Sequence, residues 1–310
     1  MLAPDFTPPA AWTLRTDRNP PPAGAHGTQV VRHETWTDAL AFMTGPKDPR
    51  FPGSSSREFN GTIQWDLGAG WEGAVAMATS RGWPEGRDRM SEALEGAANL
   101  ARFDPAPATE RDVAGAYPIV PVAVAGDPCA MVLPADMDRA RRPILRVVAN
   151  VSRSAVVKAD AIANLFGAVL SCIDAVEAAG TSVEIVAVDS YSGEFLAGGP
   201  ENRPAGAGAL FHEVTIKQAG EPLELDRIAF ALAHPAYLRR LGFRFLERFP
   251  HAAPIAGSYG RPADVPADQM EPGTVYIPAG YGEWMNACAN RAHALAHALH
   301  FFNNPIGAGA

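Results

Sequence analysis

Three small side chains that carry oxygen atoms follow an apolar run near the middle of the chain. Asn150, Ser152 and Ser154 are spaced two residues apart, directly after the run ILRVVA. Amide and hydroxyl oxygens are hard ligands that Mg²⁺ accepts together with several water molecules, and Asp189 ends a later apolar run as a further candidate ligand. Asn and Ser also cap helices and close turns. The spacing therefore predicts a cation site, a metal-free binding loop or a purely structural cap.

A second group of candidate ligands stands near the end of the sequence. If this stretch is one helix, His293, His297 and His300 share one face, opposite an apolar stripe that contains Trp284. Histidines four residues apart on a helix can bind zinc. The zinc proteases of the His-Glu-x-x-His type need Glu where this chain has Ala294, so we expect no metalloprotease. The three histidines predict a polar face toward solvent, a metal site, or a face that binds a partner or responds to pH.

The composition argues against several classes of function. The chain carries 26 Lys and Arg and has a net charge of −8, whereas a grip on the nucleic-acid backbone needs clustered cations. Nucleic acid is therefore not an expected partner. The sequence contains no P-loop, GxSxG or GxGxxG motif. Its three cysteines are scattered and form no CxxC pair, which fits a reducing cytoplasm better than a disulfide framework.

The hydropathy pattern does not indicate a membrane protein. No apolar stretch approaches ~18 residues without a charge, the length that a membrane span requires. The first residues, MLAPDFTPPAAW, lack the basic start and apolar core of a signal peptide. We therefore expect no membrane association and a cytoplasmic location.

Alternating strands and helices in the second half must position the candidate residues. The run at 144–149 predicts a buried strand, the pattern at 156–178 a long amphipathic helix, and the run at 182–190 a second strand. Strand, helix and strand make a βαβ unit. We therefore expect an α/β fold with a mostly parallel sheet and helices on both faces. Further elements are expected at 211–218 (strand), 226–238 (helix interrupted at Pro235), 274–279 (strand) and 283–302 (helix).

Shifts in composition divide the chain into three regions. Residues 1–57 read as an extended proline-rich arm and loop, with a short helix at 33–43. Residues 58–142 read as a mainly helical and partly irregular N-terminal region packed on the core. Residues 143–310 read as the α/β domain with its C-terminal helix. In the middle region, helices are expected at 71–80 and from Pro84 onward, followed by an irregular stretch at 105–143.

The candidate loop resembles that of a known family. Asn150-x-Ser152-x-Ser154, placed between a strand and a long helix, is similar to the Asp-x-Ser-x-Ser loop of von Willebrand factor A domains, and the resemblance covers residues 143–280. It implies a vWA-like or Rossmann-like layered fold with a divalent cation over the first strand. The two serines would coordinate the ion directly, and the first residue of the motif would act through water. Because Asn150 lacks the carboxylate of that family, the resemblance implies a weakened or lost site, with Mg²⁺ or no cofactor.

Two segments of the first half resemble another group of proteins. FNGTIQWDLGAGWEGAVAMATSRGWPEG and DVAGAYPIVPVAVAGDPCAM are similar to segments of uncharacterised proteins from tailed bacteriophages and prophages. This resemblance implies an origin in a phage or prophage and a location in the cytoplasm of a bacterial host, with association with the virion as an alternative.

The two resemblances together imply a non-enzymatic protein that binds or scaffolds a protein partner. An AAA+ ATPase or a phage assembly is the kind of partner expected, and a metal-ion-dependent adhesion site is the related type of binding site. Two alternatives remain open. One is a metal-dependent hydrolase or a nucleic-acid-processing enzyme that uses the carboxyl ends of the strands, and the other is a structural component of the virion.

Overall fold

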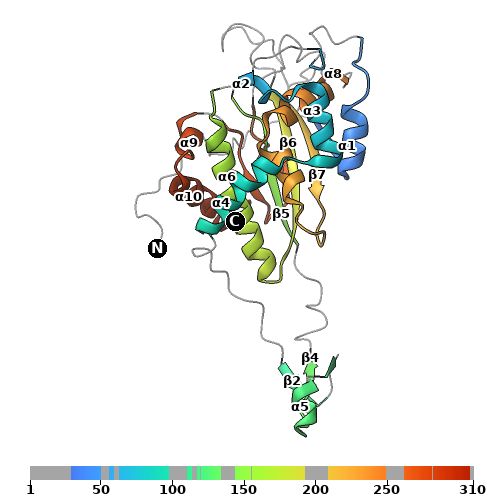
Figure 1. Ribbon diagram of the computed structural model, residues 1–310, viewed down its shortest axis with the longest axis vertical. Helices are drawn as coiled ribbons and strands as arrows, with labels where there is room; N and C mark the ends of the chain where they lie inside the picture. The colour runs from blue at the N-terminus through green and yellow to red at the C-terminus, as the bar shows by residue number, and fades with distance from the viewer. Residues whose placement is uncertain are drawn as a thin grey trace.

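A five-stranded sheet lies at the centre of the fold, in the order β1-β7-β6-β5-β8 (Figure 1). β5 pairs in parallel with both β6 and β8, and β1 pairs in parallel with β7, whereas β6 and β7 are antiparallel. The α/β class and the mostly parallel sheet expected from the sequence are therefore confirmed. The strands are β1 (Gln29–His33), β5 (Ile144–Asn150), β6 (Ser182–Ser192), β7 (Ala209–Lys217) and β8 (Val275–Ile277).

The computed structural model describes the greater part of the chain. The described residues are 29–49, 56–58, 63–97, 110–113, 117–118, 120–133, 144–154, 156–192, 209–248, 262–280 and 282–307. The proline-rich start of the predicted arm and the loop predicted at 193–208 lie outside them. The predicted division of the chain at residues 57 and 142 stays a prediction.

The predicted βαβ unit is present, with its elements close to their expected positions. α6 (Ala159–Ala178) connects β5 to β6 and contacts β6, α4, α7 and α10, so that most of its circumference is buried. Its length and a mean hydropathy of 1.5 would also suit a membrane span, which holds for no other helix among the described residues. Since 72% of that stretch is buried inside the protein, α6 has the character of a core helix.

The remaining helices follow the expected order with local changes. The helix predicted at 71–80 is α3 continued by a π-helix, η2, and the helix predicted at 226–238 breaks before Pro235 as expected, where α7 ends. The other elements are α1 (Trp36–Met43), α2 (Ile63–Asp66), α3 (Gly70–Ala76), η2 (Met77–Arg81), α4 (Pro84–Ala97), α7 (Leu225–Ala233), the π-helix η5 (Tyr237–Gly242), α8 (Phe243–Arg248), the 3-10 helix η7 (Ala267–Gln269), α9 (Gly282–Ala287) and α10 (Arg291–Asn303).

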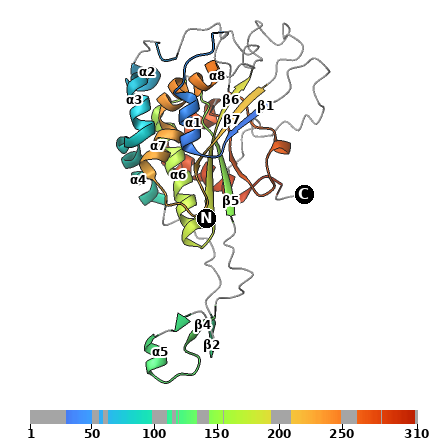
Figure 2. The ribbon, with the colours of Figure 1, turned by 90° about the vertical axis from the view of Figure 1, so that its right-hand side faces the viewer.

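The two faces of the sheet are covered differently. Side chains alternate along a strand, and one set from β5, β6 and β7 packs with the helices in the main core. Figure 2 shows α3, α4, α6 and α7 on this side. The other set forms a small cluster with Val265 and Tyr276, against the irregular segment 262–274 that contains η7. In the described part of the chain the α-helices therefore cover one face, and the expectation of helices on both faces is corrected.

β1 is an element that the sequence reasoning missed. It lies at the end of the proline-rich arm, and its short run QVV carries no period that separates a strand from a loop. Its partners in β7 come about 180 residues later, with Val31 opposite His212. Pairing with a distant strand, and not a local signal, makes this segment extended.

A small antiparallel unit lies apart from the main sheet (Figures 1 and 2). It consists of β2 (Glu110–Asp112), β3 (Tyr117–Pro118) and β4 (Met131–Leu133), in the order β2-β4-β3, with the one-turn helix α5 (Val120–Val124). The short strands agree with the irregular stretch expected there, whereas α5 was not expected in a proline-rich segment. Pro121 is accommodated because it stands in the first turn, where a helix needs no N–H donor from it.

Candidate functional site

The loop after β5 is held by hydrogen bonds of its own side chains. Asn150 is fully buried, and both atoms of its amide group are used. Its Oδ1 accepts from the backbone N–H of Ser152 and from the hydroxyl of Ser190, each at 3.1 Å. Its Nδ2 donates to the carbonyl of Ala263 at 2.8 Å and to the hydroxyl of Tyr276 at 3.1 Å. Asn150 therefore joins β5 to β6 and to the segment that covers the second face.

Ser152 is engaged in the same way. Its hydroxyl donates to the carbonyl of Ser190 at 3.0 Å and accepts from the backbone N–H of Ser190 at 2.7 Å. Asn150 and Ser152 thus meet around Ser190, a residue that the sequence reasoning did not select. Ser154 lies apart from this network and faces the cavity described below.

Asp189 lies on the opposite face of the sheet from Asn150. Neighbouring residues of a strand point to opposite faces, so Asp189 points into the helix-covered core while Ser190 points toward Asn150. The expected carboxylate ligand therefore does not converge with Asn150 and Ser152. In the described part of the chain, no group of three or more His, Cys, Asp or Glu side chains comes together as a metal site would require.

Arg153 places a positive charge inside the loop. Its Nη1 donates to the carbonyl oxygens of Asn150 and Ser152, and the guanidinium carbon lies 5.1 Å from the ring centroid of Phe166. Burial lowers the pKa of Arg153 to about 9, against the attraction of Tyr276, Asp264 and Asp189. The guanidinium therefore lies against the loop carbonyls and brings a positive charge into the loop.

Gly280 makes room for this arginine. It follows β8, and its backbone exchanges hydrogen bonds with Ser152 and Ser154. A Cβ atom at this position would overlap the Cδ atom of Arg153. The close approach of the two segments requires glycine here.

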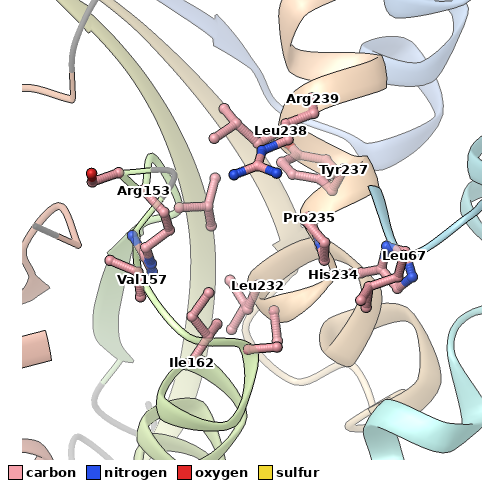
Figure 3. A pocket seen from close by; sticks show the side chains of 15 residues that line it. Leu67, Arg153, Val157, Ile162, Leu232, His234, Pro235, Tyr237, Leu238 and Arg239 are labelled. Carbon is pink, nitrogen blue, oxygen red and sulfur yellow. The ribbon is translucent and has the colours of Figure 1, made fainter. Parts of the chain in front are cut away.

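A cavity of about 90 Å³ opens beside Arg153, between the β5–α6 loop and the segment that joins α7 to η5 (Figure 3). Ser154 and Arg153 contribute from the first side, and His234 and Arg239 from the second. The rest of the wall is mainly apolar. Burial lowers the pKa of His234 to about 4, so this side chain is neutral at pH 7. The cavity lies at the carboxyl end of β5, the place where open α/β sheets bind ligands.

Asp189 belongs to a second arrangement, a row of titratable side chains under η5. Its Oδ2 lies 3.3 Å from Nδ1 of His212, and Nε2 of His212 lies 2.9 Å from Nδ1 of His33. The ring of His212 stacks on Phe245 at 3.7 Å between centroids. Burial raises the pKa of Asp189 well above its ordinary value and lowers that of His212 to about 3. Burial therefore favours the uncharged forms of both Asp189 and His212 in this row.

The π-helix η5 packs against the Asp189 end of this row. Gly242 packs so closely that an added Cβ would lie 2.8 Å from Oδ2 of Asp189 and 3.0 Å from the hydroxyl of Tyr191. Tyr237, at the start of η5, is buried, and both its burial and the nearby Asp189 raise the pKa of its hydroxyl well above the usual range. π-helical turns are rare and often occur at functional sites, and no sequence signal marked this one.

The predicted face of three histidines is divided in the structure. The expected single helix is broken between α9 and α10, and Asn290 caps the second helix by accepting from the N–H groups of Ala292 and His293. This break shifts the phase of the helical wheel. His293 is exposed and His300 half-buried, whereas His297 is buried at 5.3 Å from Trp284.

Comparison with known proteins gives one match. The family described as a domain of unknown function (DUF7192) matches residues 26–294. No curated protein and no solved structure matches the sequence.

Proposed function

We propose that this chain, which belongs to the DUF7192 family of domains of unknown function, is a non-enzymatic protein that binds or scaffolds a protein partner without a metal ion. The proposal rests on one observation, which is that the polar groups of the loop after β5 already have partners within the protein. The side-chain oxygens of Asn150 and Ser152 are already hydrogen-bonded within the protein, and the guanidinium of Arg153 lies on the loop carbonyls. A cation at this loop would have to displace these contacts.

The order of elements supports a vWA-like or Rossmann-like form of the fold. β5, the Asn150–Ser154 loop, α6 and β6 follow one another as the resemblance to von Willebrand factor A domains implies, and β5 and β6 are parallel neighbours. The helices α2, α3 and α4, which precede this unit, support the proposed N-terminal helical region. Within such a fold, the loop is the place where the family's cation would bind, and here a fixed positive side chain serves instead.

The proposed partner follows from the two resemblances. The segments similar to phage and prophage proteins support an origin in a mobile element and a location in the cytoplasm of the host. A protein partner such as an AAA+ ATPase or a phage assembly suits a vWA-like domain without chemistry of its own. The net charge of −8 favours a protein over a nucleic acid as the partner.

A metal scan tests the metal-free loop. Thermal unfolding is followed in Mg²⁺, Mn²⁺ and Ca²⁺, each against NaCl at the same ionic strength. We expect equal midpoints, because the side-chain oxygens of Asn150 and Ser152 are already engaged in hydrogen bonds within the protein. The control is Ser152→Ala, which removes two hydrogen bonds and lowers the midpoint equally with and without metal. Stabilisation by Mn²⁺ or Mg²⁺ that disappears in Ser152→Ala would overturn the proposal in favour of a metal-dependent enzyme.

A partner experiment tests the binding role. The tagged chain is purified from cells that carry the phage or prophage, beside cells that express the tag alone, and the proteins recovered are quantified by mass spectrometry. A partner in a fixed ratio to the chain is the expected result. Recovery of the chain in purified particles at a constant copy number would favour a virion component, and a chain without any stoichiometric partner would contradict the scaffolding role.

A further inference from the structure

We propose that the cavity beside Arg153 binds a small oxyanion group, a carboxylate or a phosphate, between the guanidinium groups of Arg153 and Arg239. Figure 3 shows the two side chains on different sides of the cavity, one on the β5–α6 loop and one on η5. The inference rests on the proposed role of Arg153 as the built-in charge of the loop. It does not depend on a protein partner.

The charge of the cavity wall is one-sided. The fifteen residues that line it include Arg153 and Arg239 and contain neither Asp nor Glu. The acidic influences come from outside the wall. Asp66 acts on Arg239, whose Nη1 also donates to the carbonyl of Trp65, and Asp264 acts on Arg153 more strongly than Asp189 does. Asp66 is itself bound to Arg240 by a buried ion pair at 2.5 Å. Among the described residues that line the cavity, an anion would therefore meet two guanidinium groups and no carboxylate.

Arg153 has hydrogen-bonding capacity to spare. Its Nε and Nη2 atoms are buried, and neither finds an acceptor among the residues that the structure describes. A buried donor without an acceptor costs free energy that a bound oxyanion recovers. Nε and one terminal nitrogen of a guanidinium form the fork that grips two oxygens of a carboxylate or phosphate. Nε and Nη2 of Arg153 are such a pair, since Nη1 already binds the loop carbonyls. Because both atoms are covered in the structure, gripping an anion requires this side chain to turn toward the cavity that it lines.

The size and lining of the cavity restrict the occupant. A water molecule takes up about 30 Å³ of liquid volume, so a cavity of about 90 Å³ holds a group of a few heavy atoms. Val157, Ile162 and Leu232 form apolar parts of its wall. Such a wall lowers the local dielectric constant and strengthens the attraction between an anion and the two arginines.

The start of α6 adds to the same field. Ala159, its first residue, lines the cavity, and Lys158 at the N-cap makes no side-chain hydrogen bond to the helix. The first N–H groups of a helix carry a partial positive charge, and side chains or anions usually satisfy them. A 20-residue helix thus directs its positive end toward the same space as the arginines.

The ligand is probed with simple anions. Binding to the full chain is measured by titration calorimetry and by thermal shift in phosphate and in acetate, each against chloride at the same ionic strength. We expect at least one of the two oxyanions to bind and to raise the unfolding midpoint beyond chloride. The comparison distinguishes the sources of the group: a stronger response to phosphate indicates a phosphorylated ligand, and a stronger response to acetate a carboxylate.

Variants test whether the binding uses this cavity. Arg239→Gln and Arg153→Gln should each weaken the binding at least tenfold. Arg239→Lys keeps the charge but loses the fork, so it should fall between the wild type and Arg239→Gln. The matched control is Arg227→Gln, which removes an arginine from a surface pair with Glu224 and should bind as the wild type does.

One further variant keeps both charges and removes the space. Ala233→Leu enlarges a side chain of the cavity wall, and it should abolish binding while its circular dichroism shows a folded protein. The proposal is overturned if neither oxyanion exceeds chloride, or if binding survives in folded Ala233→Leu and in Arg239→Gln. The metal scan is made without phosphate or acetate. Stabilisation by a metal ion in that scan would contradict the metal-free loop alone, and absence of anion binding in the titrations would contradict the anion site alone.

Discussion

Asp189 Oδ2 lies 3.3 Å from Nδ1 of His212, and both side chains are completely buried. The two residues face each other across the antiparallel pair β6 and β7. The other ring nitrogen of His212, Nε2, lies 2.9 Å from Nδ1 of His33. His33 is half-buried, so the row extends from the core toward the surface. Two proton arrangements satisfy this row, one with an ionised and one with a protonated Asp189. The raised pKa of Asp189 favours the arrangement with the protonated carboxyl group.

Replacing Asp189 by Asn tests this protonation state. A group whose pKa is higher in the folded than in the unfolded chain stabilises the fold at low pH and ceases to do so as the pH rises above about 4. At pH 7 Asp189 therefore weakens the fold. We expect Asp189→Asn to raise the unfolding midpoint at pH 7, and the gain to shrink as the pH approaches 4.

The pH series of thermal unfolding needs a matched carboxylate as control. Asp88 is exposed and pairs with Arg87 at the surface. Asp88→Asn should change the midpoint little at any pH, since surface pairs contribute about 1 kcal/mol or less. A midpoint for Asp189→Asn that is lowered at pH 7 would show that the carboxyl group is ionised and useful in the fold.

Three buried histidines predict loss of stability in mild acid. Burial lowers the pKa of His212 to about 3 and of His234 and His297 to about 4. In the unfolded chain the same groups take up protons below about pH 6.5. Their stabilisation is therefore present above pH 6.5 and is lost as the pH falls toward 4. Each contributes a slope of about 1.4 kcal/mol per pH unit in this window.

Urea unfolding at pH 7, 6 and 5 measures that slope. His234→Gln and His297→Gln should each remove the uptake of about one proton on unfolding, which lowers the slope by about 1.4 kcal/mol per pH unit. The double variant should lower the slope by about twice as much. If all variants lose stability as steeply as the wild type between pH 6 and 5, other groups cause the acid response.

Replacing Gly242 at the end of η5 by alanine is expected to destabilise the fold. The Cβ of Gly242→Ala would lie 2.8 Å from Oδ2 of Asp189, a buried atom on a strand that cannot retreat. Crowding of this kind costs about 1–3 kcal/mol. The control is Gly73→Ala in α3, where the nearest atom is 3.5 Å away and alanine should stabilise the helix by up to about 1 kcal/mol. Free energies of unfolding in urea compare the two, and equal effects would exclude the close contact.

The histidines of α10 should differ in their importance. His297 is buried beside Trp284 and Phe301, so His297→Asp places a charge in the core and should cost on the order of 3 kcal/mol. His293→Asp changes an exposed residue of the same helix, and its effect should stay within about 0.5 kcal/mol. Thermal unfolding measures both variants. An equal loss of stability in the two would contradict the burial of His297 and would agree with the single polar face predicted from the sequence.

Local patterns were sufficient for the framework of the fold. The apolar runs and the helical period predicted β5, α6 and β6 within a few residues, because most residues of these elements that face the core are apolar and buried. The same reasoning placed the interruption before Pro235, since proline disrupts a helix through its own ring. It also identified the Asn150–Ser154 loop, since strand, small polar residues and helix follow one another in the sequence.

The candidate site could be predicted only in part. Asn150, Ser152 and Ser154 were found as a motif, but the chemistry of the site depends on Ser190 and Arg239, which carry no local signal. Asp189 was selected because it lies at the end of a predicted strand. Its side chain points to the other face of the sheet from that of its neighbour Ser190, which contacts Asn150.

By itself, the sequence determined the class of the fold, the order of the main elements from β5 onward and the loop in which polar residues gather. Only the tertiary structure decided that β1 joins β7, that His297 is buried, and that Arg153 and Arg239 line one cavity. The reason is physical. Burial and periodicity act on neighbours along the chain and can be read locally, whereas the partners of a side chain are set by strand pairing and helix phase between residues far apart.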